Sequence, residues 1–320
     1  MARSRSTSTR ALGALLSALA ITTASACGAP EDDPATADPV RPAESGWSDH
    51  HSTTLDGVER TWSTYVPASA GEDDPVLLVI HGTGDTGSGI RRGIGPEFEN
   101  LADEHGFRIA YVDGFQNNWN ECRRQGDWPA KERDLDDVGL MREAANSLGG
   151  DGPVFAVGFS SGGHMAMRLA LEAPDLVDGV AAVAANPPTP DNQGCETGGE
   201  SVPVMFVQGR EDSINPVGGG EVRVGSGLTA RSRGDVLSAV DGARWFAEHN
   251  GVRDGDPVTR RDGDAETTTW PGADPVRLVV VDRVGHSFPT LSGRWGGDGG
   301  ARYDAPGEIW RFFSGGAGTF

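Results

Sequence analysis

The sequence of 320 residues has little basic charge and almost no lysine. It holds 27 basic residues against 47 acidic ones, which gives a formal net charge of −20, and Lys131 is the single lysine. A nucleic-acid partner needs a basic surface to meet its phosphates, so this balance excludes one. The preference for arginine over lysine indicates a GC-rich coding bias and says little about the mechanism of the protein.

Cysteine is also scarce, and metal-binding motifs are missing. The chain has three cysteines and no C-x-x-C pair, which argues against a zinc site. No D-x-D-x-D-G loop is present, so the acidic residues form a solvated surface and not a calcium site. We therefore expect no metal and no cofactor.

The first 27 residues carry the pattern of an export signal. Arg3, Arg5 and Arg10 form a basic start without acids, and an apolar run follows over residues 11–21. That run is too short to span a bilayer, and the small residues 24–26 suit a cleavage site. A buried N-terminal helix is the alternative interpretation. No later segment is apolar enough to cross a membrane.

Cys27 directly follows these small residues, as the lipidated cysteine does in a bacterial lipoprotein signal. Such signals usually carry leucine three residues earlier, where this chain has Ala24, so plain secretion is the alternative. Residues 28–46 are rich in proline, alanine and acids without an apolar period, which predicts a disordered tether. The predicted product is an extracellular domain over residues 47–320, lipid-anchored or secreted.

From Trp47 onward the composition is that of a globular domain. Residues 52–58 and 60–67 predict two short antiparallel strands. Apolar runs then alternate with amphipathic stretches, which is typical of an α/β domain with a mostly parallel sheet and helices on both faces. The expected strands are 75–80, 108–112, 154–159, 179–184, 202–207 and 276–281, and the expected helices are 96–105, 134–148, 161–173, 235–250 and 305–313.

Ser160 stands in the strongest motif of the chain. The sequence around it is G-F-S-S-G, between an expected strand and an expected helix, which is the context of a nucleophile elbow. The turn is tight, so side chains at Gly158 or Gly162 would collide with neighbouring backbone. A plain Gly/Ser turn is the alternative. The pattern predicts a catalytic serine whose hydroxyl lies above the sheet.

A serine hydroxyl needs a base to act as a nucleophile. Among the seven histidines, His286 follows the last expected strand, at the end of the sheet where Ser160 also lies. His164 is four residues after Ser160 on the same helix, where its ring is expected to point along the helix side. His81 ends a strand and has another role in the loop that follows. His286 is therefore the expected base.

The acid of a triad is expected past the strand over 202–207, where the chain reads G-R-E-D. Asp212 is the later of the two acids at the point where the strand turns into a loop. It would hold the histidine tautomer and stabilise the imidazolium. Glu211 is the alternative acid, and a solvated surface position is the structural alternative for Asp212.

A glycine-rich loop follows the strand over 75–80. Gly82, Gly84 and Gly87 spell G-x-G-x-x-G, the dinucleotide fingerprint, and Asp113 could pose as its ribose-binding acid. Two observations argue against this interpretation. The loop continues through further glycines without opening a helix at once, and an exported protein meets little nicotinamide cofactor.

The favoured interpretation is an oxyanion loop of the HG type. The amides of Ser161 and of Thr83 or Gly84 would then bind the carbonyl oxygen as it becomes an anion. A purely structural turn is the third possibility for this loop.

Six blocks of the chain resemble the secreted polyhydroxybutyrate depolymerase and feruloyl esterase-like α/β-hydrolases, over residues 52–314. The resemblance implies an α/β-hydrolase fold and carboxylic ester hydrolysis by a Ser–His–Asp triad, matched here by Ser160, His286 and Asp212. The chain has Phe288 where the family commonly has tryptophan, so the resemblance supports an esterase more than a depolymerase. The blocks are HGTGDTG (81–87), DLDDVGLM (134–141), GFSSGGHMAMRLA (158–170), GRED (209–212), GDVLSAVDGARWFAEHNG (234–251) and GHSFP (285–289).

Two cysteines remain once Cys27 is assigned to the signal. Cys122 and Cys195 both lie in long loops after parallel strands, and export permits a disulfide, so we expect them to pair, with two free thiols as the alternative. Three tryptophans lie in loops on the same rim of the site and could form a platform that binds an aryl or polymeric ester, or could simply anchor the loops by packing. They are Trp119, Trp128 and Trp295.

The sequence thus predicts a serine esterase whose substrate is a polyhydroxyalkanoate, feruloyl or short acyl ester. A peptidase or an acyltransferase on the same triad is the alternative enzyme. The alternative from another class is a catalytically silent binding lipoprotein, which has no need to keep all three triad residues.

Overall fold

The computed structural model describes residues 46–94, 96–225, 230–252, 256–291 and 303–315. They belong to one compact unit that extends from Val40 to Phe320. The predicted export signal with Cys27, nearly all of the predicted tether, and Trp295 lie outside the described residues. Among the residues described, no helix combines the length and the apolar character needed to cross a bilayer.

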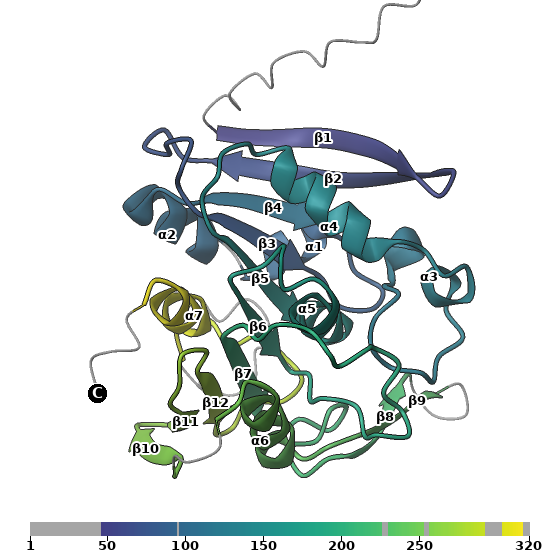
Figure 1. Cartoon of the computed structure of the whole chain (residues 1–320), viewed down its shortest axis with the longest axis vertical. Helices are drawn as coiled ribbons and strands as arrows, with labels where there is room; N and C mark the ends of the chain where they lie inside the picture. Colours follow the sequence, from purple (N-terminus) through teal and green to yellow (C-terminus); the bar gives the residue numbers. More distant parts are fainter. Residues whose placement is uncertain (1–45, 95, 226–229, 253–255, 292–302, 316–320) are drawn as a thin grey trace, which may run out of the picture. The chain divides into compact units, whose positions relative to one another are not determined.

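A ten-stranded sheet, counted over the described residues, forms the centre of the fold (Figure 1). Its order is β1-β2-β4-β3-β5-β6-β7-β12-β11-β10, and the six strands from β4 to β12 in that order are parallel. Both edges are antiparallel. The bounds are β1 Gly46–Leu55, β2 Val58–Val66, β3 Val76–Ile80, β4 Arg108–Val112, β5 Val154–Phe159, β6 Gly179–Val183, β7 Val204–Gly209, β10 Val258–Asp262, β11 Ala265–Trp270 and β12 Val276–Val281.

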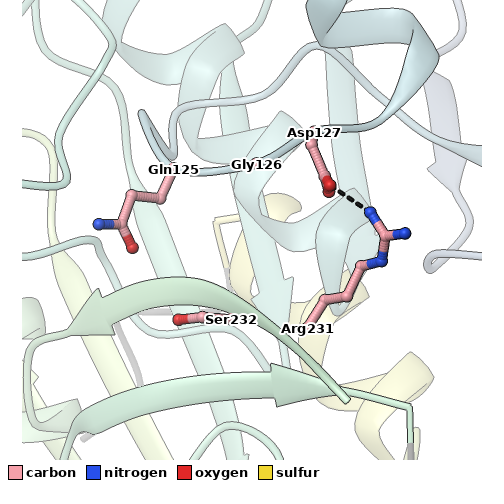
Figure 2. A pocket seen from close by; sticks show the side chains of 5 residues that line it. All are labelled: Gln125, Gly126, Asp127, Arg231 and Ser232. Atoms are coloured by element: carbon pink, nitrogen blue, oxygen red, sulfur yellow. Dashed lines mark hydrogen bonds and ion pairs between the residues drawn. The ribbon is translucent and has the colours of Figure 1, made fainter. Parts of the chain in front are cut away.

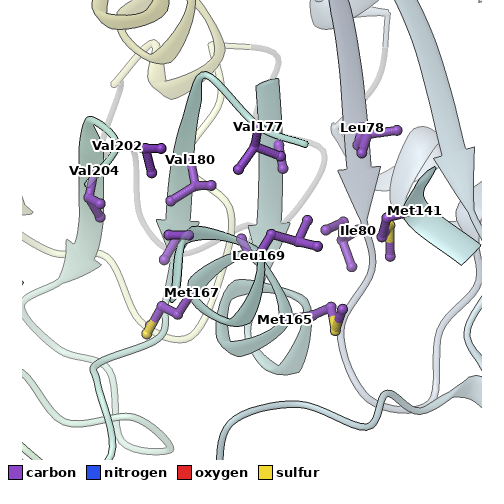
Figure 3. Close-up of a cluster of buried hydrophobic side chains, with 14 of the residues drawn as sticks. Leu78, Ile80, Met141, Met165, Met167, Leu169, Val177, Val180, Val202 and Val204 are labelled. Atoms are coloured by element: carbon purple, nitrogen blue, oxygen red, sulfur yellow. The ribbon is translucent and has the colours of Figure 1, made fainter. Parts of the chain in front are cut away.

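Helices cover both faces of the sheet, because successive side chains of each buried strand point to opposite faces. On β3, Leu78 packs in the cluster that holds residues of α4, α5 and α6, while Leu77 packs with residues of α1, α2 and α7. Figure 3 shows the first cluster, where Leu78 and Ile80 lie near Met141 and Met165. The helices are α1 Gly87–Ile94, α2 Glu97–His105, α3 Pro129–Glu132, α4 Asp137–Asn146, α5 Ser161–Glu172, α6 Ala239–His249 and α7 Ala305–Phe313.

The observed architecture is an α/β-hydrolase fold, and it confirms the predicted class and the existence of every predicted strand and of the five predicted helices. Some bounds differ: β1 ends at Leu55, and the helix expected from residue 235 begins at Ala239, because residues 231–236 form β9. Two α-helices and four strands were not predicted: α1, α3, the hairpin β10–β11, and the two-stranded sheet of β8 (Gly220–Val224) and β9 (Arg231–Val236). Strand β10 is exposed along its whole length, so no apolar alternation marks it in the sequence.

Helix α1 corrects the expectation that the glycine-rich loop would not open a helix. It begins at Gly87, directly after the G-x-G-x-x-G pattern. Three of its eight residues are glycine, so its intrinsic helix propensity is low. Tertiary contacts stabilise it instead, because Ile90 and Ile94 are buried and the Gly87 amide donates to Asp113 at 2.8 Å.

Candidate active site

Ser160 lies in a strained turn between β5 and α5. Its backbone has φ 54° and ψ −117°, a conformation that L residues rarely adopt. A Cβ at Gly158 would lie 2.0 Å from the Gly162 carbonyl oxygen, and one at Gly162 would lie 2.2 Å from the Ile80 carbonyl oxygen. These approaches confirm the expectation that both glycines are required. The turn places the serine side chain at the carboxyl end of the parallel strands.

Three of the predicted site residues meet above this end of the sheet. His286 Nε2 lies 2.9 Å from Ser160 Oγ, and His286 Nδ1 lies 2.8 Å from Asp212 Oδ2. They follow three different strands, β5, β7 and β12, of which β7 and β12 are hydrogen-bonded neighbours. The His286 side chain keeps 15% of its surface exposed while that of Asp212 is fully buried. The arrangement is a Ser–His–Asp hydrogen-bonded chain.

The surroundings of Asp212 fix the histidine tautomer. Asp212 Oδ1 accepts the amides of Ile214 and Asn215, each at 2.8 Å, which leaves Oδ2 for His286. An ionised carboxylate only accepts hydrogen bonds, so the proton of neutral His286 is on Nδ1 and Nε2 is free to accept from the serine hydroxyl. Glu211, the alternative acid, is exposed and makes no contact of this kind among the described residues.

The loop after β3 offers one of its two predicted alternatives as an oxyanion donor. The Gly84 amide donates to the Asn117 carbonyl at 2.8 Å, so Gly84 is not a free donor and Thr83 is the alternative that remains in this loop. The amides of Thr83 and Ser161 make no hydrogen bond within the described residues. Thr83 and Ser161 are therefore the candidate donors for an oxyanion.

His81 has a structural role in this loop. Its ring is buried, with Nδ1 2.7 Å from the Gly82 carbonyl and Nε2 accepting the Gly114 amide at 2.9 Å. Burial lowers the pKa of His81, so the ring is neutral. It ties the candidate oxyanion loop to the loop after β4. Asp113, the residue that a dinucleotide site would use to bind ribose, accepts hydrogen bonds from the Gly87 amide and the Thr61 hydroxyl. Its carboxylate is therefore engaged within the protein, which argues against the dinucleotide interpretation.

A disulfide joins the loops after β4 and β6, as the sequence predicts. Cys122 and Cys195 are 73 residues apart, with their Cα atoms 4.8 Å from each other. The Gly194 amide donates to the Cys122 carbonyl at 2.6 Å, so backbone pairing accompanies the bridge.

The predicted tryptophan rim is wrong for two of its three members. Trp119 is fully buried and donates from Nε1 to the His81 carbonyl at 2.8 Å. Trp128 is 5% exposed and lies under the Arg233 guanidinium, 4.3 Å from the ring centroid. Both rings anchor loops by packing, because burying their large apolar surface lowers the free energy of the folded state. Trp295 lies outside the described residues.

A buried charged cluster behind Ser160 was not predicted. The His164 ring lies back along the helix side, as expected, with Nδ1 3.1 Å from the Ser160 carbonyl oxygen, but its burial, to 2% exposure, was not predicted. Glu121 is 2% exposed and binds Arg123 through both the side chain (Nε, 2.9 Å) and the amide (2.7 Å). Glu121 and Arg123 flank Cys122 in the sequence. They lie in a loop, where no periodic pattern of apolar residues predicts which side chains are buried.

A polar pocket lies apart from these residues, between the loop after β4 and β9 (Figure 2). It contains an ion pair between Asp127 and Arg231 and none of the three residues of the Ser–His–Asp chain. No group of histidine, cysteine, aspartate and glutamate side chains suited to a metal ion occurs in the described part of the chain. The lining residues of the pocket are Gln125, Gly126, Asp127, Arg231 and Ser232.

Comparisons of this chain with known proteins agree with the observed fold. A family model of the alpha/beta hydrolase fold matches residues 75–194, which contain Ser160 and the candidate oxyanion loop. An acetyl xylan esterase from Aspergillus awamori aligns with a TM-score of 0.56 at 16% identity, over 83% of this chain and 99% of that chain. The chain has the α/β-hydrolase fold.

A relative in sequence is a protein named as an esterase, NocK, from Nocardia uniformis subsp. tsuyamanensis. It is 34% identical over 154 residues, which are 46% of this chain and 43% of NocK. The chain thus matches less than half of the length of this relative. The family model and the structural neighbour thus agree on the fold.

Proposed function

We propose that this protein is an exported serine esterase that hydrolyses carboxylic esters through an acyl-enzyme. Ser160 is the nucleophile, His286 the general base and Asp212 the acid that orients the base. The observation that carries the proposal is the continuous chain of hydrogen bonds, 2.9 Å from Ser160 to His286 and 2.8 Å from His286 to Asp212. No cofactor or metal is needed for this chemistry.

The first half-reaction forms the acyl-enzyme. His286 Nε2 accepts the proton of Ser160 Oγ as the oxygen attacks the ester carbonyl. The carbonyl oxygen becomes an anion, which the Ser161 and Thr83 amides stabilise, and one such donor contributes about 3 kcal/mol. The tetrahedral intermediate then collapses, and His286 returns the proton to the departing alcohol.

The second half-reaction releases the acid. Water loses a proton to His286 and attacks the acyl carbonyl, the same amides stabilise the second oxyanion, and Ser160 leaves with the proton from His286. Asp212 keeps its place through both halves, because its oxygens receive two amides and face the imidazole. It stabilises the imidazolium in both halves.

Export and anchoring belong to the same proposal. The basic and apolar start of the chain followed by Cys27 fits a lipoprotein signal, with residues 28–46 as a tether to the outer face of the membrane. The Cys122–Cys195 disulfide supports this location, because such bonds persist in oxidising compartments.

The substrate is an ester with an aliphatic, feruloyl or hydroxyalkanoate acyl group. A panel assay of residues 28–320 tests this directly, with p-nitrophenyl esters of increasing chain length, methyl ferulate, polyester film and a peptide p-nitroanilide. We expect ester hydrolysis by the wild type and none by Ser160→Ala. Cleavage of the anilide alone, or equal rates for both proteins, would contradict the proposal.

A further inference from the structure

One peptide group connects the nucleophile to the candidate oxyanion hole. The carbonyl of Ser160 and the amide of Ser161 belong to the same peptide unit. The Ser161 amide is one of the two donors available to the oxyanion, so its direction and strength matter for the rate. Whatever binds the Ser160 carbonyl therefore also acts on the oxyanion donor.

His164 binds that carbonyl twice. Its backbone amide donates to the Ser160 carbonyl at 3.2 Å, and its ring Nδ1 lies 3.1 Å from the same oxygen. The backbone bond is the ordinary first bond of a helix, while the ring bond is an addition that depends on the side chain. Because the carbonyl oxygen only accepts, the ring proton is on Nδ1.

The ring makes this bond as a neutral, buried group. Burial, followed by the nearby charge of Arg123, lowers the pKa of His164 to about 3. Nε2 is buried and makes no hydrogen bond of normal geometry in the described part of the chain, although the Asn186 backbone is close enough to act on the ring and raise its pKa. Leaving that nitrogen unpaired costs free energy that an apolar side chain would not cost. Besides the Ser160 carbonyl, the groups that act on the ring are Glu121, Arg123 and the backbone of Asn186, so the ring lies in polar surroundings.

We propose that His164 is a positioning residue for the oxyanion hole, which it serves by orienting and polarising the Ser160–Ser161 peptide. A hydrogen bond accepted by the carbonyl end of an amide strengthens the donor at its nitrogen end, because bonded dipoles polarise one another. The bond also holds the peptide plane of a turn with φ 54°, where the amide direction depends on a strained conformation. The proposal rests on the esterase function proposed above.

The loop that carries the disulfide supplies the charges that act on the ring. Glu121 precedes Cys122, and its charge acts on His164. Burial opposes that charge, but Arg123 prevails and the pKa of Glu121 is lowered, so the carboxylate is ionised. The Lys131 ammonium group donates to the Glu121 carbonyl at 2.9 Å, which anchors the same residue a second time. The charges that act on the ring thus belong to residues held in place by several bonds.

Three substitutions of His164 separate positioning from packing. In His164→Asn the side-chain amide nitrogen occupies the place of Nδ1, so the bond to Ser160 is kept. In His164→Gln the amide reaches the place of Nε2 instead, and in His164→Leu no donor is left. Met167→Leu, buried on the same helix, controls for disturbed packing.

The readouts are kcat and KM on p-nitrophenyl butyrate, the rate of labelling by a fluorophosphonate, and the melting temperature. Oxyanion stabilisation acts in the transition state alone, so kcat changes while KM does not. We expect His164→Leu and His164→Gln to lower kcat and the labelling rate by about 10- to 100-fold, less than the loss of a whole oxyanion donor. KM should stay within about twofold, and His164→Asn should recover most of the loss.

Two results would overturn the proposal while leaving the esterase function intact. One is unchanged kcat in His164→Leu or His164→Gln. The other is equal loss in the Asn, Gln and Leu variants in proportion to their melting temperatures, as a purely structural residue would give. If His164→Leu does not fold, the comparison of Asn with Gln decides. A wild type that neither hydrolyses esters nor takes the label would instead overturn the proposed function itself.

Discussion

His286 Nε2 lies 2.9 Å from Ser160 Oγ although 126 residues separate them in the chain. The sheet brings them together, because β5 and β12 end at the same edge with β6 and β7 between them. The carboxyl ends of parallel strands all lie at the same end of the sheet, so loops from distant parts of the sequence meet there. This convergence is the physical basis of the predictions that follow.

Asp212 is expected to act through His286 and not through the fold. Asp212→Asn keeps the size of the side chain but favours the wrong histidine tautomer, so kcat should fall by about 10⁴ with little change in melting temperature. The matched control is Glu211→Gln, because Glu211 is exposed and its side chain does not contact His286. A nearly neutral Asp212→Asn together with a severe Glu211→Gln would assign the acid to Glu211.

Gly158→Ala is expected to destabilise the fold by more than about 3 kcal/mol, at the upper end of what an overpacked site costs. The added Cβ would lie 2.0 Å from the carbonyl oxygen of Gly162, and backbone atoms cannot move aside cheaply. Gly198→Ala is the control, since its added Cβ meets nothing within 4 Å. Urea unfolding measures both variants, and similar midpoints for the two would be incompatible with this account of the turn.

Reduction of the disulfide is expected to raise KM before it unfolds the domain. The bridge closes 73 residues, for which chain entropy predicts about 4 kcal/mol as an upper estimate. It also joins the loops after β4 and β6, which emerge at the end of the sheet that holds Ser160. Kinetics and melting curves with and without reductant test this order of events. Unchanged KM in the reduced, folded protein would remove the role of the bridge at the site.

Lipidation at Cys27 is the expected mode of attachment. Mass spectrometry of the N-terminus of protein isolated from its native membrane should find acylated cysteine as the first residue. An unmodified Cys27, or a different first residue, would leave simple secretion as the export route. Cys27→Ser should then be without effect on the amount of protein released to the medium.

Much of the fold was predictable because the signals were local. Each central strand is a short apolar run buried on both faces, and the elbow joins glycines to a strand and a helix within a few residues. Helix α1 could not be predicted from propensity, since the cap from Asp113 and the burial of Ile90 stabilise a glycine-rich segment. Strand β10 lies at an exposed edge and carries no apolar period.

The site was predictable in part, for the same reason. Ser160, Asp212 and His286 each follow a recognisable strand, so their positions in the chain suggest that they meet. The burial of Trp119 and the bond of His164 to the Ser160 carbonyl depend on tertiary contacts that no sequence period encodes. The sequence also allowed Gly84 as an oxyanion donor, but its amide donates to the carbonyl of Asn117 in the loop after β4, which is a tertiary contact of the same kind.

The most direct test of the central claim is the activity of purified Ser160→Ala on the ester that the wild type hydrolyses best, with circular dichroism as the control for folding. The account predicts an unchanged spectrum and a loss of kcat of about 10⁴ to 10⁶, which is typical when a triad member is removed. A folded Ser160→Ala that keeps more than about a hundredth of the wild-type rate would contradict the nucleophile assignment, because it would lie far outside that range.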